Sequence, residues 1–308
     1  MASISTSELS RERAALISLI TSGDKLRWAE FRDQLSGGET LPSELLESQR
    51  NFDPTMFEQG YDRIEEWQAR SNGASFYCYL DDGYPDQLRT VWDFPPFVFI
   101  KGDEDPLKSG NEDLGICIVG SRRPSAESVA LTRQITSQLV SEGITAIAGL
   151  AEGIDQEVHR TALKHDARTV GVIGTGIDRY YPASSRGIQE RMEQGDGMVL
   201  SQFVPGSPPT RYSFPMRNAT MSAYGQASII VEASEKSGTR HQARQAVRHG
   251  RPLILLEQVA RGTTWGHELT AEGALIDAYI ARDAEEAVEL AFGVFDRRTV
   301  PGVMEIKR

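Results

Sequence analysis

Cysteine is scarce in this sequence, and its scarcity narrows the chemistry that the chain can perform. Only two cysteines occur among 308 residues, Cys78 and Cys117. Neither has a cysteine or histidine neighbour at the spacing of metal ligands. A disulfide framework and a zinc finger are therefore excluded. We expect both thiols to be buried as small apolar side chains, and we expect no bound metal.

Long apolar runs are also missing. No stretch of the sequence reaches the roughly 20 residues that a membrane helix needs. Charged residues, Glu8, Arg11, Glu12 and Arg13, stand where a secretory signal would have its apolar core. The sequence therefore predicts a cytoplasmic protein with no membrane partner.

Lysine is rare in the middle of the chain, which changes the meaning of the net charge of −11. Residues 111–285 contain 16 Arg and 2 Lys against 20 Asp and Glu, a net of −2, which leaves −9 for the rest of the chain. The total charge argues against a nucleic-acid ligand, but the arginine-rich middle does not. Arginine is the better donor to phosphate and the better stacking partner for bases, although most arginines form structural ion pairs.

Composition divides the chain into four segments. We expect a helical accessory domain over residues 1–75, an extended lead-in segment packed on the main domain over 76–110, a Rossmann-like domain over 111–292, and a tail over 293–308. The lead-in segment contains two aromatic, strand-like runs, and the Pro95-Pro96 pair excludes a helix there.

Beyond residue 110, short apolar strands alternate with helices. Strands are expected at 116–119, 144–148, 169–173, 198–200, 229–231, 253–256 and 278–280. Crossovers of this kind are right-handed and produce a parallel sheet that is covered on both faces. The predicted fold class is α/β, a doubly wound Rossmann-like parallel sheet with a small N-terminal helical domain.

Turns rich in small residues follow four of these strands. They contain Gly120-Ser121-Arg122, Gly149 to Gly153, Gly174-Thr175-Gly176, and Ser237-Gly238-Thr239. In a doubly wound sheet such turns meet at the carboxyl edge, where backbone N–H groups can hold a phosphate. A Ser-Gly-Thr sequence is also an ordinary helix N-cap. No turn completes the dinucleotide fingerprint or the Walker pattern, so a standard site of either kind is disfavoured and no cofactor is expected.

Taken together, the motifs resemble the DNA-processing protein A family, also called DprA or Smf. The matching stretches are IVGSRRPS (118–125), AGLAEGIDQEVHRTAL (148–163), GVIGTGIDRYYP (171–182), FPMRN (214–218) and VEASEKSGTRHQARQAVRHGRP (231–252). The resemblance implies a protein that binds single-stranded DNA, forms a homodimer, and assists the loading of RecA recombinase on incoming or exposed DNA. It implies a binding protein rather than an enzyme.

The resemblance also assigns a phosphate-binding groove. The candidate residues are Ser121, Arg122, Gly149, Gly153, Thr175, Gly176, Arg217, Asn218, Ser237, Gly238 and Thr239. Arg217 and Asn218 are expected to open a helix, and Phe214 or Tyr212 to stack on a base. An ion pair that fixes the turn is the alternative role for Arg217.

Departures from the family pattern mark this chain as a divergent member. Glu152 stands where the family usually has a basic or neutral residue, and Ala219 stands where a second arginine is common. The segment Leu255 to Gln258 replaces the usual V-P-G. A groove with fewer cations is expected to bind phosphate more weakly.

Two other functions stay open. The turn after the fifth strand also resembles that of phosphoribohydrolases, but Gln242 replaces their carboxylate. Asp155 and Glu232 could act as acid and base. We interpret Asp155 instead as a helix-start residue and Glu232 as an acceptor for N–H groups in that turn. The other alternative is a sensor for a nucleotide signal, of the kind that would suit a defence system, which predicts a closed pocket rather than an extended groove. His159 lies four residues after Asp155, where the two could pair.

Overall fold

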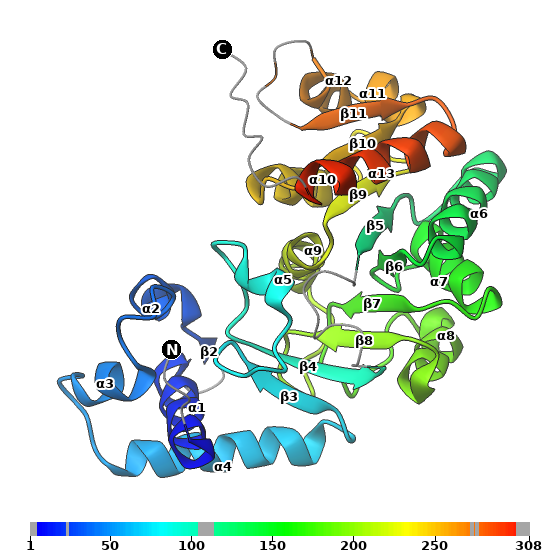
Figure 1. The fold of residues 1–308 in the computed structure, drawn as a ribbon. Coiled ribbons are helices and arrows are strands. Elements are labelled where there is room, and N and C mark those ends of the chain that lie inside the picture. Colours follow the sequence, from blue (N-terminus) through cyan, green and yellow to red (C-terminus); the bar gives the residue numbers. More distant parts are fainter. Residues whose placement is uncertain (1–4, 23–24, 104–113, 272–273, 275–276, 300–308) are drawn as a thin grey trace.

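The centre of the molecule is a sheet of nine strands, seen in a computed structural model that describes residues 5–22, 25–103, 114–271, 274 and 277–299 (Figure 1). The strand order is β11-β10-β9-β5-β6-β7-β8-β4-β3. The strands are β3 (Ser75–Cys78), β4 (Phe97–Gly102), β5 (Gly115–Val119), β6 (Thr145–Ala148), β7 (Thr169–Ile173), β8 (Met198–Ser201), β9 (Ala227–Ile230), β10 (Leu253–Leu256) and β11 (Ala278–Ala281). A separate two-stranded sheet pairs β1 (Thr21–Ser22) with β2 (Lys25–Leu26).

The strands from β5 to β11 are all parallel, and the predicted doubly wound fold is confirmed. Each of the seven expected strands is present, with ends that differ from the prediction by no more than two residues. Strand β5 is buried at every position, as expected for an apolar run with helices on both faces. The sheet is mixed rather than purely parallel, because β4 and β3 add to the edge at β8 in antiparallel pairing.

Helices cover both faces of the sheet, and others form the N-terminal region beyond its edge (Figure 1). They are α1 (Thr6–Ile20), α2 (Trp28–Leu35), α3 (Pro42–Glu47), α4 (Thr55–Arg70), α5 (Asp86–Arg89), α6 (Ala126–Ser141), α7 (Ile154–Lys164), α8 (Arg186–Arg191), α9 (Ser213–Tyr224), α10 (Thr239–Arg248), α11 (Glu257–Gly262), α12 (Thr264–Leu269) and α13 (Ala284–Thr299). Helices α6, α7 and α13 enclose one apolar core with the sheet. Helices α9 and α10 enclose a second core, which continues into the N-terminal helices.

Aromatic side chains join the N-terminal helices to the edge of the sheet. Trp67 of α4 lies with its ring centroid 5.1 Å from Phe97 and 6.4 Å from Phe99, both on β4. Phe76 on β3 completes this cluster at 6.3 Å from Trp67. The two aromatic runs of the lead-in segment thus form β3 and β4. Both cysteines are buried, as predicted.

The chain's division into four segments stays a prediction, with one correction at its end. The tail expected over 293–308 does not begin at residue 293, because α13 continues to Thr299 and buries Val294 and Phe295 against the core. Residues 300–308, and the boundary expected at residues 110 and 111, lie outside the described residues.

Helix α9 starts earlier than the sequence suggested. It begins at Ser213, so Arg217 lies in its second turn rather than at its start. Thr210 and Ser213 exchange hydrogen bonds at the helix entry, each hydroxyl accepting from the other residue's N–H at 3.0 Å. This reciprocal pairing satisfies backbone donors that a helix start leaves free.

His159 does not pair with Asp155. Its Nδ1 lies 2.9 Å from the hydroxyl of Thr169, which itself donates to the Ala146 carbonyl at 2.7 Å. The single hydroxyl proton is therefore committed, so Nδ1–H of His159 must be the donor. Burial, above all, with help from the charge of Arg217, lowers the pKa of His159 to about 3.

In the described ranges, none of the helices combines the length and the apolar character that a bilayer crossing requires.

Candidate nucleic-acid interface

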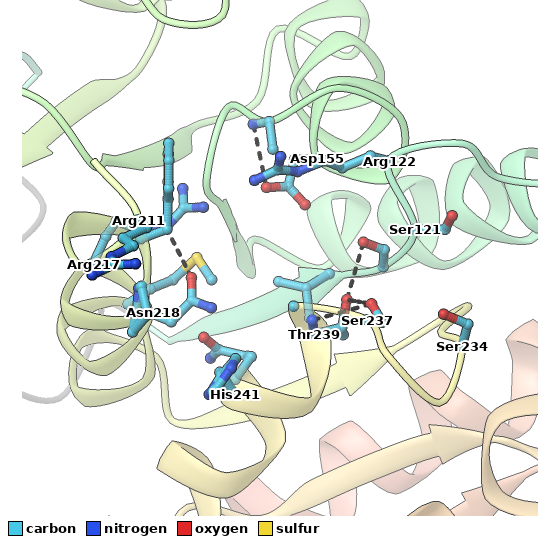
Figure 2. Close-up of a pocket in the computed structure, with 18 residues that line it drawn as sticks. Ser121, Arg122, Asp155, Arg211, Arg217, Asn218, Ser234, Ser237, Thr239 and His241 are labelled. Atoms are coloured by element: carbon cyan, nitrogen blue, oxygen red, sulfur yellow. Dashed lines mark hydrogen bonds between the residues drawn. The ribbon is translucent and has the colours of Figure 1, made fainter. Parts of the chain in front are cut away.

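A cleft opens where the direction of the sheet's connections reverses. Strands β5 and β9 are neighbours, yet β5 leads to β6 on one side and β9 leads to β10 on the other. Ligands of doubly wound folds bind at the carboxyl ends of such strands. Here the cleft has a volume of about 460 Å³ and is lined by the turn after β5, by residues of the segment 234–242, and by α9. Figure 2 shows Arg217 and Asn218 on one side of it and Ser237 and Thr239 on the other.

Most of the predicted groove residues meet in this cleft. Those that line it are Ser121, Arg122, Arg217, Asn218, Ser237, Gly238 and Thr239. Gly149 lines a smaller adjoining cavity. Gly153, Thr175 and Gly176 line neither of the two.

The turn after β6 packs against the turn after β5 and holds it in place. Gly153 has a φ of +81°, and a Cβ there would lie 2.4 Å from the Ser121 carbonyl oxygen. The N–H of Ile154 donates to that same oxygen at 3.2 Å. Glycine is thus required at position 153 because two backbones approach closely. Gly153 supports Ser121 and Arg122 and does not face the cleft itself.

The turn after β9 is tied to the turn after β5. The Ser237 hydroxyl accepts from the N–H of Thr239 at 3.2 Å and donates to the Thr239 hydroxyl at 2.9 Å. That hydroxyl in turn donates to the Gly120 carbonyl at 3.2 Å. Gly238 is the N-cap residue of α10 and makes no side-chain cap, so Ser237, one residue before it, satisfies the first N–H of the helix instead. The N-terminus of α10, with its positive end of the helix dipole, borders the cleft.

Arg217 is a buried cross-link between two strands. Its side chain is 5% exposed, and its Nη1 donates to the Gly149 carbonyl and, at 2.9 Å, to the Val172 carbonyl. Its Nε donates to the Asn218 side-chain oxygen at 2.9 Å. A Cβ on residue 149 would lie 1.8 Å from Nη1, so glycine at this position leaves room for the guanidinium. These hydrogen bonds fix the ends of β6 and β7. The alternative considered for Arg217 was an ion pair that fixes the turn, whereas the bonds described here go to backbone carbonyls.

Asp155 is the nearby carboxylate whose negative charge stabilises the buried Arg217 cation. Its carboxylate accepts from the N–H groups of Gly149 at 3.0 Å and Ala151 at 3.3 Å, which shapes the turn after β6. Burial raises the pKa of Asp155 above its usual value, although Arg217 and the two N–H groups oppose that shift. Burial also lowers the pKa of Arg217, and Asp155 opposes that change. Asp155 lies in the first turn of α7, where the sequence had placed it.

Of the two predicted arginines, Arg122 and Arg217, only Arg122 is exposed. Its guanidinium carbon lies 5.4 Å from the centre of the Phe214 ring, and Phe214 lies 5.8 Å from the ring of Tyr181. The cavity of about 130 Å³ beside these rings shares Arg122, Phe214 and Arg217 with the cleft. The hollow surface therefore continues past the cleft along aromatic side chains. Tyr212, the other predicted stacking residue, is 64% exposed and carries the Arg211 guanidinium 4.6 Å above its ring.

Thr175 and Gly176 support the fold behind the cleft. Thr175 is 1% exposed, and its carbonyl accepts from the Ser201 hydroxyl at 2.6 Å. The N–H of Gly176 donates to the Ser207 carbonyl at 3.0 Å. Both residues thus anchor the loop that follows β8. Small residues after a strand predicted a ligand site here, but they serve the close packing of two loops.

Two exposed side chains of the cleft that could donate to a phosphate were not among the predicted residues. Arg211 lies in the loop before α9, and His241 lies in the first turn of α10. An irregular loop gives no periodicity that would orient Arg211. The position of His241, two residues after the Ser-Gly-Thr turn, was the available signal, since first-turn side chains border whatever a helix N-terminus faces.

Glu232 serves a helix end and does not face the cleft. Its carboxylate accepts from both the N–H and the hydroxyl of Ser125, each at 2.9 Å, at the start of α6. Burial acts to raise the pKa of Glu232, but the hydrogen bonds from serines outweigh it, and the pKa lies below its usual value. It is an acceptor, as predicted, but for a different turn. Among the described residues, no group of three or more His, Cys, Asp or Glu is arranged to hold a metal.

Comparison with known proteins gives concordant relatives. A profile of the family described as DNA recombination-mediator protein A matches residues 75–291. DNA processing protein DprA of Streptococcus pneumoniae is 32% identical over 253 residues, which cover 81% of this chain and 86% of the relative. DprA of Bacillus subtilis is 33% identical over 199 residues, which cover 64% and 66%. The chain spans 53% of the length of protein Smf from Synechocystis.

Solved structures agree with these relatives. The crystal structure of DprA from Streptococcus pneumoniae superposes with a TM-score of 0.68 at 26% identity, covering 90% of this chain and 95% of that one. DprA of Helicobacter pylori, described for its mode of binding single-stranded DNA, shares the fold with a TM-score of 0.61 at 24% identity, covering 71% and 96%. The chain therefore belongs to the DNA recombination-mediator protein A family, the DprA and Smf proteins.

Proposed function

We propose that this protein binds single-stranded DNA along the cleft at the ends of β5 and β9. The observation that carries the proposal is the continuity of the hollow surface. The cleft passes Arg122 and Phe214 and continues into a second cavity beside Tyr181. Phosphates would meet exposed cations and bases would meet aromatic rings, which is the usual division of contacts with single strands.

The charge of the cleft is modest and suits this ligand. Arg122 and Arg211 are exposed cations on its lining, and His241 is an exposed imidazole beside them. The Arg217 guanidinium already donates to backbone carbonyls, and Ala219 stands where the family often has a second arginine. With two phosphates neutralised by these arginines, the logarithm of affinity should fall with the logarithm of salt at a slope of about −1.4.

The biological setting follows from the family. The Streptococcus and Bacillus relatives are named DNA processing proteins, which supports a DNA ligand. By resemblance we extend the proposal to a homodimer that protects incoming or exposed strands in the cytoplasm and assists RecA loading. We assign no reaction, because Asp155 alone of the two carboxylates considered as acid and base borders the cleft.

A nucleotide sensor is the second candidate, and one observation favours it. Helix α9 borders the cleft through Arg217 and Asn218, while its Met216 and Ala219 line a cavity of about 370 Å³ that also touches Trp28 of α2. One helix thus connects the cleft with the N-terminal helices. A cleft of about 460 Å³ is also within the range of small-molecule sites.

Binding of fluorescently labelled oligo-dT, measured by anisotropy across a salt series, tests the proposal. Arg122→Ala should weaken binding more than fivefold, as expected when a charge-assisted hydrogen bond worth roughly 1–3 kcal/mol is lost. Arg261→Ala is the matched control, because that side chain is 73% exposed and lies outside the cleft. Unchanged affinity in Arg122→Ala would contradict the site. Binding of a mononucleotide without binding of oligo-dT at low salt would support the sensor instead.

A further inference from the structure

The small cavity beside Arg122 has the form of a subsite for one base. It measures about 130 Å³, and its walls include Tyr181, Pro182 and Phe214. The Tyr181 ring is 43% exposed and lies 5.8 Å from Phe214, with 37° between the two ring planes. Tyr181 is exposed and Phe214 is half-buried, so the Tyr181 ring offers a face on which an unstacked base can lie.

One carboxylate borders this cavity, and it is held in position. Glu152 lies in the turn between β6 and α7, and its Oε1 accepts from the Ser184 hydroxyl at 3.1 Å. Ser184 in turn accepts from the Gln156 amide at 3.0 Å. Gln156 is only 6% exposed and also donates to the Ser185 hydroxyl at 2.8 Å. Glu152 is thus oriented by a chain of hydrogen bonds that ends in the protein interior.

We propose that this cavity is a base subsite in which Glu152 selects guanine. The inference rests on the proposed function, since it requires a single strand in the adjoining cleft. A carboxylate only accepts hydrogen bonds, and its two oxygens can take two parallel donors. Guanine presents two such donors side by side, N1–H and the N2 amino group. Adenine and cytosine pair their amino group with a ring nitrogen that repels a carboxylate, and the N3–H of thymine lies between two carbonyl oxygens.

The Glu152 carboxylate also has an unfavourable effect on the binding of any single strand, whatever its sequence. Its negative charge lies on the cavity that Arg122 also borders, so it opposes any phosphate there. Glu152 should therefore weaken binding to strands without guanine and favour strands that contain it. Replacing its charge should strengthen binding to strands without guanine and reduce the advantage of strands that contain it. A merely repulsive residue would shift every sequence alike.

The test uses the full-length protein and four labelled oligonucleotides, d(T)16, d(TG)8, d(TC)8 and d(TA)8, in a lithium buffer that disfavours guanine tetrads. The unmodified protein should bind d(TG)8 at least fivefold more tightly than d(T)16. Glu152→Gln should bind d(T)16 more tightly and should reduce the advantage of d(TG)8 to less than twofold. Glu142→Gln, an exposed acid at the end of α6, controls for net charge.

The outcomes separate the inference from the function on which it rests. Equal affinity for all four sequences, with binding that still depends on Arg122, would overturn the guanine preference and leave the binding function intact. An equal shift of all four affinities in Glu152→Gln would assign repulsion alone and would also overturn it. Absence of binding to every oligonucleotide would overturn both proposals.

Discussion

Arg217 should be required for folding more than for contact with DNA. Replacing it by methionine keeps an apolar stem but removes the donors to the Gly149 and Val172 carbonyls. Each buried carbonyl left without its partner costs about 1–3 kcal/mol. Asp155, buried beside it, would also lose the cation that opposes the rise of its pKa. Removal of one partner from a buried pair costs about 3–5 kcal/mol in measured cases, and we expect Arg217→Met to lower the free energy of unfolding by a similar amount.

Urea denaturation followed by tryptophan fluorescence measures this loss. Arg122→Met is the matched control, because Arg122 belongs to the same cleft but is exposed. Its unfolding midpoint should stay close to that of the unmodified protein while its oligo-dT affinity falls. If Arg217→Met unfolds within about 0.5 kcal/mol of the unmodified protein, the usual range for surface substitutions, the structural role is wrong. If it also loses DNA binding, Arg217 contacts the ligand directly.

Two further predictions concern the same frame. Gly149→Ala should lower the urea midpoint about as much as Arg217→Met, because its Cβ would lie 1.8 Å from the Arg217 Nη1. Gly238→Ala is the control and should fold normally, because a Cβ there has nothing within 4 Å. Equal urea midpoints for the two alanine variants would contradict this. His159 should make the protein acid-sensitive: burial lowers its folded pKa from 6.5 to about 3, so below pH 6.5 the unfolded chain binds a proton that the folded chain does not. Stability should then fall by about 1.4 kcal/mol per pH unit from pH 6.5 towards pH 3, and urea titrations at pH 7, 5.5 and 4.5 should show a shallower fall in His159→Gln.

The sheet was predictable from the sequence because its signal is local. Continuous apolar runs such as 116–119 and 253–256 mark buried parallel strands. Small-residue turns such as Gly120-Ser121-Arg122, which follow four of the strands, mark the edge where ligands bind. The order of the strands then brings the turns after β5 and β9 together. Seven of the predicted site residues meet in the cleft for that reason. The antiparallel edge at β4 depends on pairing across about 100 residues, which no local pattern encodes.

The roles of individual residues were less predictable, since they depend on the side that a side chain faces. Gly153 and Thr175 follow strands as a phosphate-binding turn would require, yet one accommodates a neighbouring backbone and the other anchors a loop. Arg217 belongs to a family motif, and its burial becomes visible only when the carbonyls of two strand ends lie beside it. Spacing in the sequence cannot distinguish a glycine that makes room for a ligand from one that makes room for a guanidinium.

In the cleft, the residues that fix the walls differ from the residues that are available to a ligand, and this difference bears on whether the ligand is a strand or a mononucleotide. Buried polar groups fix the walls: Arg217 joins the ends of β6 and β7, and Thr239 joins the turns after β9 and β5. The exposed Arg122, Arg211 and His241 lie on the lining and can donate hydrogen bonds to phosphates at separate points. A mononucleotide would satisfy one group of these donors, whereas a strand would engage several and continue past Phe214. Loss of Arg122 should therefore weaken a long oligonucleotide only in part, because the remaining donors still hold it, but it should nearly abolish binding of a short one centred on that turn.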